Sequence, residues 1–153
     1  MDVTPERLTF RERGFPYSTF PTGWFQVGWS DELAAGDVVP LRCFGRDLVL
    51  FRTRSGVATI LDGACAHMGA ALAFGGVVED ECLRCPFHAW LWGADGALVE
   101  VPYSTRTPGA SLRTWPTREA SGVVYVWHDH LGGAPTWEPP VVAEDVDPGF
   151  HRG

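Results

Sequence analysis

Two short motifs are the most informative part of this sequence: Cys65-Ala66-His67-Met68-Gly69 and Cys85-Pro86-Phe87-His88. Seventeen residues separate the histidine of the first motif from the cysteine of the second. Each motif offers one thiol and one imidazole, and each contains a glycine or a proline, which are typical of loops. Thiolates and imidazoles are strong ligands for iron and zinc. The motifs therefore predict two neighbouring loops that bind a metal centre through Cys65, His67, Cys85 and His88.

Two kinds of metal centre use two thiolates and two imidazoles, namely a [2Fe–2S] cluster and a single tetrahedral zinc ion. Structural zinc sites usually have C-x₂₋₄-C or H-x₃₋₅-H spacings. The spacings here are C-x-H and C-P-x-H, which favours the cluster, with a zinc-stabilised non-catalytic module as the alternative. Two thiolates balance the charge of the oxidised cluster core, so this centre accepts an electron more easily than a four-cysteine cluster. Its expected reduction potential is roughly −150 to +300 mV, compared with about −400 mV for plant-type ferredoxins.

The sequence on either side of the motifs predicts short strands joined by tight turns. Runs rich in Val, Leu, Phe and Trp are separated by turn residues such as Gly45-Arg46-Asp47 and Ser55-Gly56, which is typical of antiparallel β-sheets. The predicted strands cover residues 24–29, 38–44, 48–53, 57–61, 97–101, 112–117 and 123–127, with a hairpin over 77–84. One irregular stretch is predicted over 63–76, and a second begins at Cys85. The predicted fold class is therefore all-β.

Length and composition exclude several classes of protein. With 153 residues, of which 45% are hydrophobic, the chain is long enough for one domain with a substantial core. Its net charge of −7 argues against binding to nucleic acid or to an anionic membrane surface. No stretch approaches the ~18 uninterrupted apolar residues of a membrane span, and residues 1–10 lack the apolar region of a secretory signal. The expected location is the cytoplasm, where cysteines stay reduced and available for metal.

The distribution of residue types predicts three segments. Residues 1–20 form a polar N-terminal arm, and residues 21–131 form the domain that carries both motifs. Residues 132–153 are rich in proline, glycine and acidic residues, and they are predicted to form an extended C-terminal tail or linker.

The longer stretches around the motifs, Asp62–Ala70 and Cys85–Trp92, resemble the Rieske domain of Rieske non-haem iron oxygenases. Within that family the sequence is most similar to the oxygenase component of 3-ketosteroid 9α-hydroxylases and to cholesterol 7-desaturases. The resemblance covers roughly Pro21 to Pro140. It includes four further stretches, Gly23-Trp24-Phe25, Gly93–Gly96, Val101-Pro102-Tyr103 and Gly122–Asp129.

This resemblance implies a fold, a ligand set and electron-transfer partners. The fold is a Rieske-type antiparallel β-sandwich or barrel with an inserted small cluster-binding subdomain. Cys65 and Cys85 ligate one iron of a Rieske [2Fe–2S] cluster, and His67 and His88 ligate the other. A flavin- or ferredoxin-type reductase supplies electrons, and a mononuclear iron that activates O₂ on a steroid or a similar apolar substrate accepts them.

Four residues beside the ligands are predicted to contribute to the cluster site. Met68, Phe87 and Trp90 flank the ligands and are interpreted as a shield against water, with plain packing as the alternative. Gly69 is interpreted as a residue that permits a tight loop.

The sequence departs from the oxygenase family at the catalytic iron site. That site uses a D-x-x-H-x₄-H motif to build a facial triad, and the remaining histidines, His128, His130 and His151, do not have this spacing. No catalytic residue is therefore assigned. The chain is predicted to be an oxidoreductase component that relays electrons to a mononuclear iron on a separate domain or subunit. A free-standing Rieske-type ferredoxin is the alternative.

Three other features have simple interpretations. The H-x-H pair of His128 and His130 is more typical of a polar strand end than of a metal site. Cys43 and Cys82 are predicted to be structural, because the set of four donors is complete without them. The acidic run 79–81 is typical of a solvated turn, with docking of a basic reductase as the alternative.

Overall fold

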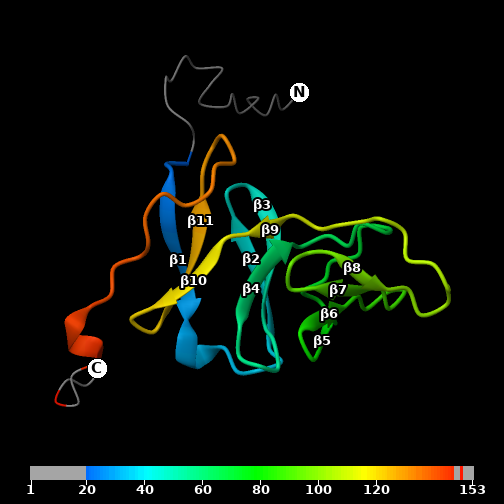
Figure 1. Cartoon of the computed structure of the whole chain (residues 1–153), viewed down its shortest axis with the longest axis horizontal. Coiled ribbons are helices and arrows are strands. Elements are labelled where there is room, and N and C mark those ends of the chain that lie inside the picture. The colour runs from blue at the N-terminus through cyan, green and yellow to red at the C-terminus, as the bar shows by residue number, and fades with distance from the viewer. Residues whose placement is uncertain (1–19, 147–148, 150–153) are drawn as a thin grey trace, which may run out of the picture.

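The computed structural model describes residues 20–146 and residue 149, so the predicted N-terminal arm lies outside the described residues apart from Phe20. The described chain forms antiparallel strands and two short 3₁₀ helices, which confirms the predicted all-β class (Figure 1). The strands are β1 (Gly23–Trp29), β2 (Val38–Cys43), β3 (Arg46–Arg52), β4 (Ala58–Asp62), β5 (Val77–Glu79), β6 (Cys82–Arg84), β7 (Leu91–Gly93), β8 (Leu98–Glu100), β9 (Thr114–Trp115), β10 (Thr117–Ala120) and β11 (Val123–His128). The helices are η1 (Ser30–Glu32) and η2 (Ala143–Val146). Among the residues described, no helix is long and apolar enough to cross a bilayer.

The strands form three sheets that lie side by side in Figure 1. The first sheet has the order β1-β11-β10, the central sheet β2-β3-β4-β9, and the small sheet β5-β6-β7-β8. The small sheet is built from consecutive strands and is inserted in the sequence between β4 and β9 of the central sheet. This topology is the predicted one, in which a small subdomain is inserted into a larger β base.

Strand β3 packs against both neighbouring sheets. Its side chains alternate, so that Leu48 and Leu50 pack toward the first sheet and Val49 and Phe51 pack toward the small sheet. All four side chains are buried. Burial of each of these side chains contributes about 1.5–3 kcal/mol to the free energy of folding. Because the four side chains face in two directions, strand β3 stabilises both cores.

The core between the central and small sheets contains the cysteines of both motifs. Cys65 and Cys85 are buried there together with Leu72, Leu83 and Trp92. Packing of the two cysteines in this hydrophobic core therefore positions both loops independently of a bound metal.

Two strand predictions were wrong in detail. Residues 112–117 do not form one strand, because Pro116 has no N–H for the ladder. The chain instead changes sheets there, so that β9 pairs with β4 and β10 pairs with β11. The stretch after Cys85 is not irregular throughout, because β7 pairs with both β6 and β8.

The described part of the C-terminal segment packs along the first sheet. The Trp24 indole N–H donates to the carbonyl oxygen of Trp137 at 2.7 Å, and the Val142 N–H donates to Ser121 Oγ at 2.7 Å. Figure 1 shows this segment running beside β1. The boundary at residue 132 stays a prediction.

An ion pair between Arg52 and Glu119 joins the central sheet to the first sheet. The Arg52 guanidinium donates to both carboxylate oxygens of Glu119, at 2.7 and 3.0 Å, and to the carbonyl oxygens of Leu33 and Gly56. The hydrogen bond from Arg52 holds the pKa of the Glu119 carboxyl below its ordinary value. A carboxyl group with a lowered pKa in the folded state stabilises the protein above its unfolded pKa, and this stability is lost as the pH falls through the folded value.

We expect Glu119→Gln to lower the free energy of unfolding by about 1–2 kcal/mol near pH 7, because a charge-assisted hydrogen-bonded pair is lost. The difference from the parent protein should shrink at acidic pH, as the pH falls through the lowered pKa of Glu119 in the folded protein and the parent carboxyl becomes protonated. Urea denaturation at both pH values measures this. Glu138→Gln, which breaks the exposed 2.9 Å pair with Arg118, is the matched control and should cost almost nothing. Equal losses in the two variants would contradict the role of Glu119.

Candidate metal centre

The two motifs lie in loops at one end of the small sheet. The first loop leads from β4 to β5, and the second connects β6 to β7. The loops pack against each other, since a Cβ built at Gly75 would lie only 3.3 Å from Pro86. The structure therefore brings together the four predicted donors, although they come from two separate parts of the sequence.

The two loops have matching backbone hydrogen bonds. In each loop the cysteine N–H donates to the carbonyl oxygen five residues later, and the cysteine carbonyl accepts the N–H four residues later. The bonds are Cys65 to Ala70 (2.8 Å), Gly69 to Cys65 (2.8 Å), Cys85 to Trp90 (2.8 Å) and Ala89 to Cys85 (3.1 Å). Each cysteine thus occupies the same position in the same kind of turn.

The fourth residue after each cysteine has a left-handed backbone. Gly69 has a φ of +75° and Ala89 a φ of +58°. Glycine adopts this conformation freely, whereas a residue with a Cβ pays about 1–2 kcal/mol. The structure therefore places Gly69 where a glycine is needed, and it shows strain at Ala89.

We expect Ala89→Gly to raise the free energy of unfolding by about 0.5–1 kcal/mol, because relief of this strain exceeds the entropy that glycine adds to the unfolded chain. Gly69→Ala should lower it by a similar amount, since a Cβ at Gly69 meets no atom within 4 Å and only the backbone is strained. Urea denaturation of the two variants measures both effects. Ala66→Gly, in an exposed part of the first loop without a left-handed backbone, should instead destabilise. A destabilised Ala89→Gly protein would refute the strain argument.

The two thiols lie at the inner side of the site. Cys65 and Cys85 are each only 3% exposed. Burial raises the pKa of the Cys65 thiol, and the neighbouring Cys85 thiol raises it further. The backbone N–H of His67 and the indole N–H of Trp92 act in the opposite direction, because both favour the thiolate. The two sulfurs are thus neighbours in the core between the central and small sheets.

The two imidazoles lie nearer the surface. His67 and His88 are both half-buried, and their ring centroids are 4.8 Å apart. The Trp90 ring stacks on the His67 ring at 4.3 Å with an angle of 9° between the planes. Trp90 is itself fixed by a hydrogen bond from its indole N–H to the Tyr103 hydroxyl at 2.6 Å. This stacking holds the His67 ring in one orientation.

One atom of His88 shows that the site suits a metal. His88 Nδ1 is buried, and it has no hydrogen-bond partner among the described residues. A buried imidazole nitrogen without a partner costs free energy unless a ligand occupies its lone pair. In the part of the chain that the structure describes, no three His, Cys, Asp or Glu side chains converge on a single ion position. The donors instead form an inner pair of thiols and an outer pair of imidazoles, which suits two bridged irons.

The other residues predicted around the cluster have different environments. Met68 is 67% exposed, and Phe87 is 62% exposed, with its ring 4.0 Å from that of His88. Trp90 is half-buried against His67. Sequence reasoning missed Trp92, which is completely buried beside the cysteines. The signal that could have found it is a tryptophan in the short apolar run after Cys85, because a buried indole N–H needs a partner.

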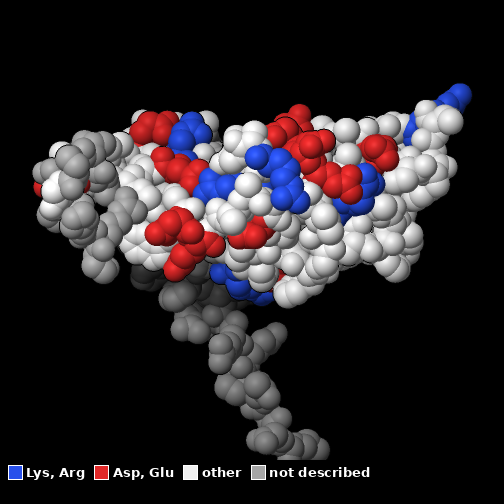
Figure 2. All heavy atoms as spheres, turned by 90° about the horizontal axis from the view of Figure 1, so that it is seen from below, with Lys and Arg blue, Asp and Glu red and all other residues white. Residues whose placement is uncertain are grey.

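The remaining cysteines and the acidic turn have contacts of their own. Cys43 is half-buried at the end of β2, Cys82 is half-buried in β6, and burial raises the pKa of each thiol. Glu79 pairs with Arg84 at 2.5 Å, and Glu81 accepts a 2.7 Å hydrogen bond from Ser55 Oγ. Two of the three carboxylates of the acidic turn are therefore engaged within the chain. Figure 2 shows basic and acidic side chains interspersed over one face of the molecule.

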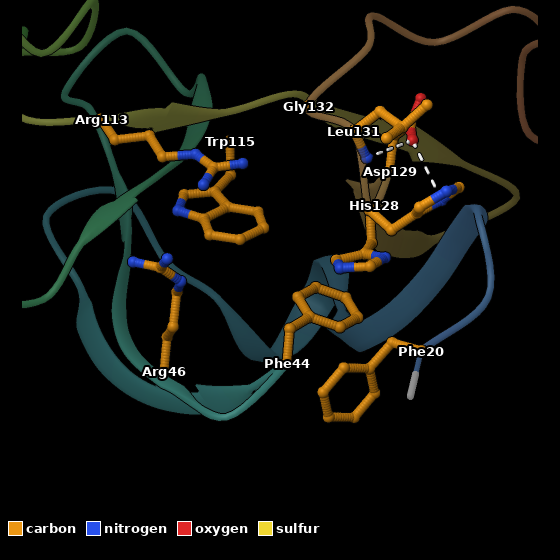
Figure 3. A pocket seen from close by; sticks show the side chains of 10 residues that line it. Phe20, Phe44, Arg46, Arg113, Trp115, His128, Asp129, Leu131 and Gly132 are labelled. Carbon is orange, nitrogen blue, oxygen red and sulfur yellow. Dashed lines mark hydrogen bonds and ion pairs between the residues drawn. The ribbon is translucent and has the colours of Figure 1, made fainter. Parts of the chain in front are cut away.

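A separate pocket of about 500 Å³ lies between the β2–β3 turn and the segment after β11 (Figure 3). It is lined by aromatic rings and by charged side chains, and it contains none of the four donors. His128 lies there with its Nδ1 3.1 Å from the carbonyl oxygen of Pro21 and its ring 4.3 Å from that of Phe44. His130 Nδ1 lies 3.3 Å from Thr22 Oγ1. These two histidines make local contacts, and the donor site is elsewhere.

An antiparallel β protein with a buried pair of thiols and an outer pair of imidazoles in two facing loops has the donor set of a Rieske-type iron–sulfur protein. The chain belongs to the Rieske [2Fe-2S] domain family, whose match covers residues 23–116. Its cofactor is accordingly a Rieske-type [2Fe–2S] cluster, and the resemblance seen in the sequence is confirmed.

Several longer proteins are similar to this chain. The cholesterol 7-desaturase nvd 1 of Ciona intestinalis is 43% identical over 126 residues, which are 82% of this chain and 27% of that protein. The probable 3-ketosteroid-9-alpha-monooxygenase oxygenase component of Rhodococcus rhodochrous is 38% identical over 150 residues, which are 96% of this chain and 37% of that protein. The chain thus spans about a third of the length of these relatives.

A solved structure shows the same fold with a partner protein. In the reduced complex between oxygenase and ferredoxin in carbazole 1,9a-dioxygenase, the matching chain is 29% identical with a TM-score of 0.64. The match covers 86% of this chain and 33% of that chain. The chain is therefore a Rieske domain that is similar to part of a cholesterol 7-desaturase, of a 3-ketosteroid-9-alpha-monooxygenase oxygenase component and of the carbazole 1,9a-dioxygenase oxygenase.

Proposed function

We propose that this chain relays single electrons within a steroid-hydroxylase-like oxygenase system. It accepts them from a flavin- or ferredoxin-type reductase and passes them to a mononuclear iron on a separate domain or subunit. The observation that carries this proposal is the donor site itself, with two thiols in the core, two imidazoles nearer the surface, and a buried His88 Nδ1 that has no partner among the described residues.

We assign Cys65 and Cys85 to the inner iron and His67 and His88 to the outer iron. When bound, the [2Fe–2S] cluster supplies reversible one-electron transfer. The neutral imidazoles make the outer position the one that more easily holds an extra electron. Because the outer imidazoles are half-buried, they are also the part of the site that a partner protein can approach.

The residues around the imidazoles keep the outer side of the site apolar. Trp90 covers one face of His67, and Phe87 packs against His88. Met68, which follows His67 in the sequence, and Tyr103, which accepts the hydrogen bond from Trp90, add exposed apolar surface. These apolar side chains reduce the access of water to the cluster, which affects its reduction potential. They also form an apolar surface on which a partner protein can pack.

The same apolar surface supports docking of a partner protein through shape and apolar contact more than through net charge. The acidic turn at 79–81 is largely paired within the chain, and charges of both signs alternate over one face (Figure 2). The similar oxygenase of carbazole 1,9a-dioxygenase forms a complex with a ferredoxin, which supports a small electron-transfer protein as donor. The proposed compartment is the cytoplasm, whose reducing conditions suit four free cysteines.

Coulometric titration of the purified, iron-loaded protein tests this function. Photoreduced flavin serves as the electron donor and ferricyanide as the acceptor, and the visible spectrum is recorded throughout. We expect each chain to take up one electron and to return it over repeated cycles with full recovery of the spectrum. A colourless chain that holds one zinc ion, or a cluster that is destroyed on its first reduction, would rule out the relay function.

A further inference from the structure

The pocket between the β2–β3 turn and the segment after β11 has a volume of about 500 Å³ and two chemically different sides. Arg46 and Arg113 lie on one side, next to the Trp115 ring (Figure 3). The rings of Phe44 and His128 lie on the other side. Pockets of this volume commonly hold small molecules, whose charged groups meet a few polar side chains and whose apolar parts pack on aromatic rings.

The two arginines of the pocket, Arg46 and Arg113, pair with no carboxylate in the part of the chain that the structure describes. Both side chains are exposed. In a chain with a net charge of −7, two guanidinium groups without acidic partners form a local positive site. A guanidinium presents its N–H donors in a planar fork that matches a carboxylate. Four other arginines already have such a partner, namely Arg42, Arg52, Arg84 and Arg118.

Asp129 also lines the pocket, but its carboxylate is engaged by neighbouring segments. Its Oδ1 accepts a hydrogen bond from the Leu131 N–H at 2.9 Å, and Thr22 Oγ1 and His130 Nδ1 each lie 3.5 Å from the same oxygen. Figure 3 shows Asp129 and His130 across the pocket from the two arginines. The arginine side of the pocket therefore keeps its positive charge.

The aromatic rings of the pocket are held in place by one another. The rings of Trp115 and Phe44 stack at 5.6 Å, and those of Phe44 and His128 lie 4.3 Å apart. The Trp115 indole N–H donates to Asp62 Oδ1 at 2.9 Å, and the Arg113 guanidinium lies 4.1 Å from the centre of the Trp115 ring. Phe44 has a left-handed backbone with a φ of +54°, which is unusual for a bulky residue. Because these walls are already ordered, a ligand loses less entropy on binding.

We propose that this pocket binds an organic carboxylate that carries an aromatic ring. The carboxylate pairs with the guanidinium groups of Arg46 and Arg113, and the aromatic ring packs against Phe44 and His128. An exposed ion pair alone contributes little to binding, and so does a single ring contact. The two sides of the pocket together favour a ligand that has both groups. This inference does not depend on the proposed function, because none of the four donors lines the pocket.

Isothermal titration calorimetry with 2-naphthoate tests the chemical class of the ligand. Two further probes each lack one half of it, since 2-naphthamide has no charge and acetate has no ring. We expect saturable binding of one 2-naphthoate per chain, and we expect both other probes to bind at least about tenfold more weakly. Absence of saturable 2-naphthoate binding would overturn the inference. Equally tight binding of 2-naphthamide would also overturn it, because the arginines would then have no part in recognition.

Three arginine variants test the location of the site. Arg46→Gln and Arg113→Gln should each weaken 2-naphthoate binding at least about tenfold, because each removes a charge-assisted hydrogen bond. Arg106→Gln is the matched control, since it removes the same charge from an exposed arginine between β8 and β9 that does not line the pocket. It should keep the parent affinity, and the circular dichroism spectra of all three variants should match that of the parent. An equal loss of affinity in Arg106→Gln would mean that only overall charge matters and would contradict the proposed site.

A second measurement uses the parent protein and needs no variant. Phenylglyoxal modifies accessible guanidinium groups, and mass spectrometry of proteolytic peptides locates the modified arginines. We expect saturating 2-naphthoate to slow the modification of Arg46 and Arg113 at least about fivefold and to leave that of Arg106 unchanged. Unchanged modification of Arg46 and Arg113 in the presence of bound 2-naphthoate would place the ligand elsewhere and refute the proposed site.

Discussion

Replacement of Cys85 by alanine is expected to abolish the visible absorption of the iron-loaded protein. The Cys85 sulfur lies in the core beside that of Cys65, and the proposed inner iron depends on both. The remaining donors cannot complete the coordination of two bridged irons, and no other thiol of the described core occupies this position. We expect iron and sulfide to fall from about two of each per chain to near zero, as measured by chemical analysis and absorption spectroscopy.

Cys82→Ala is the matched control for this experiment. Cys82 lies three residues before Cys85 and is half-buried in β6. It is predicted to be structural, so the variant should keep its cluster, its spectrum and its potential. A cluster that survives in Cys85→Ala but is lost in Cys82→Ala would show that the ligand assignment is wrong.

His67→Cys is expected to lower the reduction potential by about 100 mV or more. The variant replaces a neutral imidazole by a thiolate, which adds one negative charge at the outer iron. Replacement of both imidazoles would bring the centre to the four-cysteine type at about −400 mV, compared with roughly −150 to +300 mV for two histidines. A single replacement should give an intermediate value. A redox titration followed by EPR measures the shift.

The exposed residue His130 provides the control for an added thiol. His130→Cys places the new thiol away from the donor loops, beside Thr22 and Asp129. It should leave the potential unchanged. If His67→Cys also left the potential unchanged, or raised it, His67 would not be a ligand of the cluster.

The sequence predicted most of the fold because its strands have strong local patterns. Short apolar runs bounded by turn residues marked β2, β3 and β4, and the turn at Asp95-Gly96 marked the start of β8. Strand β7 and the boundary between β9 and β10 were missed, because tertiary contacts decide them. Strand β7 follows directly after a loop and has no alternation, since all three of its residues are buried. Strands β9 and β10 were merged because the change of sheet at Pro116 depends on which neighbours each half meets.

The four predicted donors lie together in the structure. The sequence could identify them because their residue types and spacing are those of a metal-binding site. The layering of the site could not be predicted in the same way. Whether a thiol or an imidazole points inward depends on the matching turns at Cys65 and Cys85 and on the core between two sheets. Trp92 was missed for the same reason, because its complete burial beside the cysteines is decided by tertiary packing and not by its position in a motif.

The central claim is that two thiols and two imidazoles hold a pair of bridged irons unequally. The most direct test is metal and sulfide analysis combined with pulsed EPR of the reduced protein, prepared with ¹⁵N-labelled histidine. The account predicts about two irons and two sulfides per chain, with two histidine nitrogens coupled to the cluster spin. Both couplings should remain in a variant that carries His128→Gln and His130→Gln together. One metal ion per chain without sulfide, or a cluster without coupling to histidine nitrogen, would contradict it.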